Sequence, residues 1–80
     1  MHGCDGGLME NAFHYVIDRG LCSEENYPYE GKNNVCRNCK EMITISDCRE
    51  VPSYNETVLK YAVLKKPISV AVDASSLSFQ

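Results

Sequence analysis

A cysteine, a glycine pair and the start of an amphipathic helix follow one another within residues 3–13, and this order constrains the fold more than any other feature. Gly6 and Gly7 lack a Cβ atom, so another backbone can approach them closely and unusual φ values cost little. Cys4 can cross-link this loop to another part of the protein. The pattern predicts a helix over residues 7–18, which Gly20 ends. Its apolar face consists of Leu8, Met9, Ala12, Phe13, Val16 and Ile17.

The middle of the chain predicts a long loop followed by a strand. Residues 21–41 are rich in charged and turn-forming residues, and a loop of this length in a compact domain usually needs a cross-link. Residues 42–51 then alternate between apolar and polar side chains at their start, which predicts a strand that Pro52 ends.

The C-terminal third predicts a second helix and a second strand. Ser53 and Glu56 have the spacing of a capping box, with Asn55 as the competing N-cap, and Pro67 ends the helix. Alternation over residues 68–73 predicts a half-buried strand. Because helices and strands do not alternate regularly, the expected class is α+β.

Length, charge and cysteine content narrow the kind of protein. Eighty residues make one small domain, whose core is marginal without cross-links or a partner. The net charge of −3 with mixed signs gives no basic stripe for nucleic acid, and no apolar run is long enough for a membrane. The first residues lack the pattern of a signal peptide. Five cysteines favour an oxidising compartment, and their odd number leaves at least one without a partner in the chain.

Two of the cysteines have a spacing that metal sites use. Cys36 and Cys39 form a C-x2-C pair, which could bind zinc together with Cys22, Cys48 or a histidine. A second C-x2-C or an H-x3-H is absent, so we predict neither a metal site nor a cofactor.

Several landmarks in a fixed order resemble one enzyme family. They are Gly3-Cys-Asp-Gly-Gly7, Asn26-Tyr-Pro-Tyr-Glu-Gly31, Val35-Cys-Arg37 and the stretch from Val51 to Ala74. Together they resemble the papain-like cysteine proteases, the family of cathepsin L and papain. Ser78-Phe-Gln80 resembles the point where the family chain continues towards its catalytic histidine.

The resemblance implies an incomplete papain-like fold. Residues of about 1–49 would belong to the helical lobe and residues of about 50–80 to the start of the β-barrel lobe. The family's cysteine lies in a Cys-Gly-Ser-Cys-Trp type of segment, which this sequence lacks together with any Trp. The catalytic cysteine, histidine and asparagine and the oxyanion-hole glutamine are therefore expected outside this chain, and the chain alone is expected to be inactive.

The resemblance also implies substrate-binding residues. Gly6 and Gly7 would pair through their main chain with an extended peptide, although the residues alone also allow a plain loop-to-helix junction. Leu8, Met9 and Ala71 would line the pocket for the second residue before the scissile bond, although periodicity alone favours a core role for them. The expected partners are a peptide or protein substrate and the rest of the same protease domain.

Cysteine pairing and processing complete the expectations from the resemblance. Cys4 and Cys36 would each bridge to a cysteine nearer the N-terminus, outside this chain, whereas Cys22, Cys39 and Cys48 match no common family position. Asn55-Glu-Thr57 is an N-glycosylation sequon, and the expected location is the lysosome or vacuole, or secretion. The competing hypothesis is a small cysteine-rich binding module without catalysis.

Overall fold

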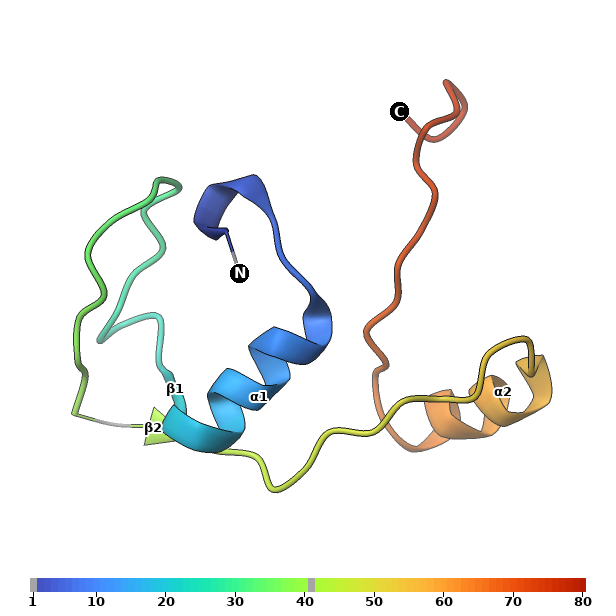
Figure 1. Cartoon of the computed structure of the whole chain (residues 1–80), viewed down its shortest axis with the longest axis horizontal. Coiled ribbons are helices and arrows are strands. Elements are labelled where there is room, and N and C mark those ends of the chain that lie inside the picture. The colour runs from blue at the N-terminus through green and yellow to red at the C-terminus, as the bar shows by residue number, and fades with distance from the viewer. Residues whose placement is uncertain (1, 41) are drawn as a thin grey trace. The chain divides into compact units, whose positions relative to one another are not determined.

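The computed structural model describes residues 2–40 and 42–80 and divides the chain into two compact units, Met1–Arg49 and Glu50–Gln80 (Figure 1). The resemblance to the papain-like family implies a passage from the helical lobe to the barrel lobe at about the same residues. The assignment of the two units to those lobes stays a prediction.

The first unit is built around one amphipathic helix. A short 3-10 turn, η1 (Gly3–Asp5), precedes the helix α1 (Met9–Arg19). The helix begins two residues later than predicted because Leu8 is extended, with φ −100° and ψ 140°, and serves as its N-cap. Gly20 ends it as predicted: its φ of 83° suits glycine, and its N–H donates to Val16 O at 2.9 Å.

A two-stranded antiparallel ladder closes the loop that follows the helix. The strand β1 (Leu21–Cys22) pairs with β2 (Met42–Ile43), with Leu21 opposite Ile43 and Cys22 opposite Met42. The predicted loop over residues 21–41 is therefore wrong at its first two residues, and its last residue lies outside the described residues. The Cys22–Cys39 disulfide cross-links this loop. A cross-link is what the sequence leads us to expect for a loop of this length.

The strand predicted over residues 42–51 is wrong in extent, because only Met42–Ile43 is paired. The partner strand ends after Cys22, where the chain turns and Tyr27 N–H donates to Ser23 O at 2.9 Å. A ladder can extend only as far as both strands do, so the alternating residues beyond Ile43 have no neighbour to pair with.

The second unit contains the helix α2 (Glu56–Lys65). Of the two predicted caps, Asn55 is the one used: its side-chain oxygen accepts from Val58 N–H at 3.1 Å. Lys66 N–H donates to Ala62 O at 3.4 Å, and Pro67 follows directly after this last turn.

The strand predicted over residues 68–73 is wrong, since that segment makes no ladder in the part of the chain that the structure describes. Alternation prepares a segment for pairing, but the strand itself needs a neighbour's backbone groups. Within the described residues, the chain combines helices with a small sheet, which is consistent with part of an α+β domain.

Neither unit encloses a hydrophobic core among the described residues. Val16 and Ile17 on α1 are half-buried, as is Leu59 on α2, whereas Leu64 is 73% exposed. The apolar faces of both helices are thus left largely uncovered. No helix in residues 2–40 and 42–80 combines the length and apolar character that crossing a bilayer requires.

Candidate functional site: the glycine turn before the first helix

Gly6 ends a closed turn of the main chain, and Gly7 follows directly after it. His2 N–H donates to Gly6 O at 2.7 Å, Asp5 N–H to His2 O at 3.0 Å, and Gly6 N–H to Gly3 O at 3.3 Å. Gly6 has φ 112° and ψ −175°, a conformation that residues with a side chain rarely adopt. The sequence therefore needs glycine here to form the turn. We call residues 2–6 the glycine turn.

The two glycines differ in the backbone groups that they offer. Both main-chain polar groups of Gly6 are used inside the glycine turn. Gly7 N–H and C=O make no hydrogen bond within the part of the chain that the structure describes. In this conformation the backbone surface open to an extended peptide is at Gly7.

The two apolar residues after the glycines are exposed. Leu8 is 62% and Met9 40% exposed, so neither has the core position that periodicity alone favours. Ala71, the third residue of the predicted pocket, is exposed in the extended segment of the second unit. All three side chains remain open to contact from elsewhere.

Asn33 anchors the glycine turn from a distant part of the sequence. Its side-chain Oδ1 accepts from Cys4 N–H at 2.7 Å, across a separation of 29 residues, and brings the loop tip to the N-terminal turn (Figure 1). Gly3 has φ +57°, and a Cβ built there would overlap Asn33 Oδ1. Sequence reasoning missed Asn33, because an asparagine in a polar loop carries no pattern that identifies its partner.

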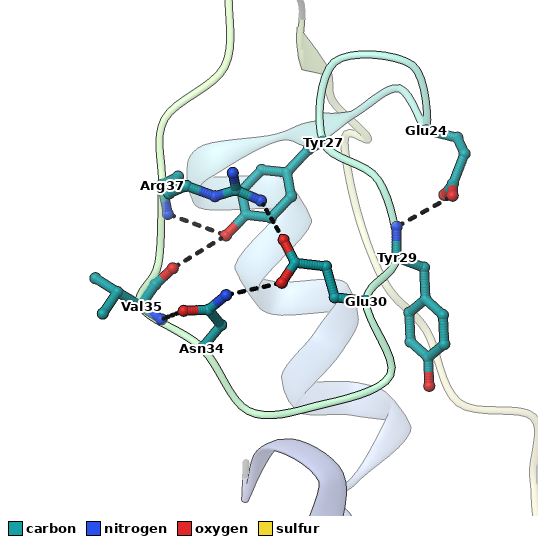
Figure 2. Close-up of polar contacts among 7 residues, drawn as sticks. All are labelled: Glu24, Tyr27, Tyr29, Glu30, Asn34, Val35 and Arg37. Atoms are coloured by element: carbon teal, nitrogen blue, oxygen red, sulfur yellow. Dashed lines mark hydrogen bonds and ion pairs between the residues drawn. The ribbon is translucent and has the colours of Figure 1, made fainter.

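A polar network holds the loop that carries Asn33 (Figure 2). The Arg37 guanidinium lies 4.7 Å from the centre of the Tyr27 ring and makes a 2.9 Å ion pair with Glu30. Asn34 Nδ2 donates to the other Glu30 oxygen at 2.8 Å. The Tyr27 hydroxyl accepts from Arg37 N–H at 3.0 Å and donates to Val35 O at 3.5 Å. These bonds restrain residues 27–37 as a unit.

A surface cavity of about 600 Å³ lies on the same unit, and Tyr15, Cys22, Tyr27 and Cys36 contribute to its lining. The Cys36 thiol beside Tyr15 raises the pKa of the Tyr15 hydroxyl. None of the predicted substrate-binding residues lines this cavity.

The cysteines separate into one disulfide and three thiols. Cys22 and Cys39 are bonded, with their Cα atoms 6.1 Å apart, so Cys39 is not available as the thiolate ligand that the zinc hypothesis needed. The described residues contain no group of three or more potential metal ligands. Cys4 and Cys36 are exposed thiols and Cys48 is half-buried.

The comparisons with known proteins agree with the motifs. Residues 1–80 match the model of the papain family cysteine proteases. The chain therefore belongs to the papain family, as the resemblance predicted, and this membership does not favour the cysteine-rich binding module.

Three relatives illustrate the match. The chain is 46% identical to Testin-2 of Rattus norvegicus, with 99% of this chain and 25% of Testin-2 covered. It is 44% identical to Cysteine proteinase COT44 of Brassica napus, with 98% and 25% covered. It is 43% identical to Zingipain-1 of Zingiber officinale, with 99% and 37% covered. The chain thus spans between a quarter and somewhat over a third of these relatives' lengths. No solved structure matches its fold.

Proposed function

We propose that this chain forms part of the catalytic domain of a papain-like cysteine endopeptidase, where it supplies substrate-cleft wall and scaffold. The observation that carries the proposal is the family match over all 80 residues by a chain that spans only 25–37% of the three relatives described above. We refer to the complete domain as the parent domain. Its substrates would be peptides or proteins.

The reaction assigned to the parent domain is peptide-bond hydrolysis through a thioester. A thiolate paired with an imidazolium attacks the scissile carbonyl, the histidine protonates the leaving amine, and water then hydrolyses the thioester. We assign the nucleophile, the histidine and its orienting asparagine to sequence outside this chain, because no segment here matches the family's nucleophile context.

The direct test compares the 80-residue chain with the parent domain. We expect the parent domain to hydrolyse a fluorogenic dipeptide amide under reducing, mildly acidic conditions, and a thiol-directed epoxide to stop it. The isolated chain should show no turnover and no cooperative thermal melt, because no hydrophobic side chain of its described residues is buried. Epoxide-sensitive turnover by the isolated chain would contradict the proposal.

We further propose that Gly7 pairs with the substrate main chain, and that Leu8, Met9 and Ala71 are pocket-lining residues of the parent domain. The unpaired backbone groups of Gly7 and the exposure of the three side chains support these roles. None of these three pocket side chains carries a charge. Burying a Leu- or Phe-sized substrate side chain in an apolar pocket contributes roughly 1.5–3 kcal/mol to the free energy of binding. The parent domain should therefore prefer Leu, Phe or Val over Arg at the second residue before the cut.

The Ala71→Leu variant tests the pocket. A larger side chain at residue 71 should penalise Phe more than Val, since a filled pocket rejects the larger substrate side chain first. A positional-scanning peptide library on the wild-type and variant parent domains measures this discrimination. Unchanged Phe-to-Val discrimination, or a wild-type profile dominated by Arg, would assign these residues to scaffold.

The proposed location is the lysosome or vacuole, or outside the cell. The Cys22–Cys39 disulfide supports an oxidising compartment. Cys4 and Cys36, both exposed thiols here, are proposed to bridge to cysteines outside this chain. Asn55 is proposed as a glycosylation site: it caps α2 through Oδ1, while its Nδ2 makes no hydrogen bond with the described residues. Endoglycosidase treatment of protein from a secretory host, with Thr57→Ala as the sequon-free control, tests this site.

A further inference from the structure

We propose that Asn33 is a positioning residue for substrate binding, which sets the main chain of Gly7 through the glycine turn. The inference rests on the proposed function, since it needs a peptide that pairs with Gly7. It assigns a role to a residue that neither motif nor periodicity singled out.

The mechanical connection is short. Asn33 Oδ1 holds Cys4 N–H at 2.7 Å, and Cys4 lies inside the glycine turn. His2 N–H closes that turn onto Gly6 O at 2.7 Å, so movement at Cys4 moves the peptide plane that joins Gly6 to Gly7. That plane carries the Gly7 N–H and sets the position of the Gly7 Cα atom. The position of the Gly7 C=O, the group that would accept a substrate N–H, therefore also depends on the anchor at Cys4.

Gly3 makes the anchor specific. Its φ of +57° turns the chain so that Cys4 N–H points at Asn33, and its missing Cβ leaves the space that Asn33 Oδ1 occupies. Adding a side chain at Gly3 would displace the Asn33 amide and break the same hydrogen bond. Gly3 and Asn33 thus depend on each other.

The loop behind Asn33 is held before any ligand binds. The Arg37–Glu30 ion pair and the two hydrogen bonds of the Tyr27 hydroxyl cross-link residues 27–37, the loop that contains Asn33 (Figure 2). A loop held by its own hydrogen bonds and ion pair positions the residue that it carries at a lower entropic cost on binding. Asn33 therefore transmits the order of this network to the glycine turn.

The test uses two peptide amides that differ only in the second residue before the cut, with a free backbone N–H in one and an N-methyl group in the other. The wild-type parent domain should prefer the unmethylated peptide, because only that peptide can pair there through its N–H. Asn33→Ala removes the acceptor and should lower this preference roughly three- to tenfold, mostly through KM. Asn33→Asp keeps an oxygen acceptor and should retain the preference.

Asn38→Ala is the matched control. Asn38 is an exposed asparagine of the same unit that makes no hydrogen bond within the described residues, so its loss should leave the preference unchanged. An active Asn33→Ala domain with the full wild-type preference overturns the inference while leaving the proposed function intact. A wild-type parent domain without peptidase activity overturns the proposed function itself, and the inference with it.

A second variant keeps the inference testable if the Asn33→Ala domain does not fold. If Asn33→Ala does not fold, Gly3→Ala displaces the Asn33 side chain instead, and the loss of preference should be of the same size. A folded Gly3→Ala domain with undiminished preference also overturns the inference.

Discussion

The two units of the chain differ in the sequence separation of the bonds that form inside each of them. In Met1–Arg49, the Cys4–Asn33 hydrogen bond spans 29 residues and the Cys22–Cys39 disulfide spans 17. In Glu50–Gln80, the side-chain hydrogen bonds of the described residues span six residues or fewer, as between Gln80 and Ala74. Short-range bonds form a helix but do not fold a segment onto itself. The first unit can therefore hold a shaped turn, while the second depends on contacts from elsewhere.

The largest expected effect comes from removing the disulfide. Replacing Cys22 and Cys39 together by Ser should cost the parent domain about 3 kcal/mol, since closing a loop of this length limits the unfolded chain. Amide hydrogen exchange should then quicken at β1 and β2 and much less at α2. Cys48→Ser, which removes a cysteine outside the disulfide, is the control. An equal loss of protection from hydrogen exchange in both units would contradict the proposal that the disulfide stabilises mainly the first unit.

The helix cap gives a smaller effect confined to the second unit. Asn55→Ala should destabilise the parent domain by about 1 kcal/mol, because Val58 N–H loses its acceptor. Asn55→Asp keeps that oxygen and should cost little. Denaturant unfolding and the exchange of α2 amides measure the change. If hydrogen exchange quickened at the Cys4 amide as much as at α2, the effect would not be confined to the second unit, and the prediction would be wrong.

The smallest effects concern two exposed carboxylates, one in each unit. The backbone N–H of Cys48, then the Arg49 side chain, lowers the pKa of Asp47. The Ser75 hydroxyl, then its backbone N–H, lowers the pKa of Asp73. A carboxylate whose pKa is lower in the folded than in the unfolded state stabilises the fold at pH values above its unfolded pKa. This stabilisation is lost as the pH falls through the folded pKa. Both carboxylates should titrate below the ordinary value of 3.8.

Side-chain removal separates the two carboxylates. Arg49→Ala should leave most of the lowered pKa of Asp47, since its main donor is a backbone group. Ser75→Ala should bring the pKa of Asp73 closer to 3.8, since the Ser75 hydroxyl is the larger cause of the lowered pKa. The Ser75 backbone N–H, which donates to Asp73 Oδ1 at 3.0 Å, remains in this variant. Carboxyl-detected NMR titration follows each group. The reverse order of the two responses would refute the assignment of donors.

Local chemistry could be predicted from the sequence wherever a feature depends on a few neighbouring residues. The periodic apolar residues predicted the helix α1, and Gly20 was correctly predicted to end it. Asn55 was one of the two predicted caps of α2 and is the one that the structure uses. The family was also predicted, because its landmarks are short motifs in a fixed order. The predicted roles of Gly6, Gly7, Leu8, Met9 and Ala71 stay predictions.

Features that join distant residues were decided by the tertiary structure. Alternation over residues 68–73 predicted a strand, but no described neighbour pairs with it, and β2 is only as long as its partner β1. Cysteine spacing left the pairing open, and the folded loop brought Cys22 to Cys39. Asn33 became the anchor of the glycine turn only when the loop of residues 27–37 folded back onto Cys4. A helix and its caps bond within one or two turns of the chain, whereas ladders, disulfides and side-chain anchors need a partner that only folding supplies.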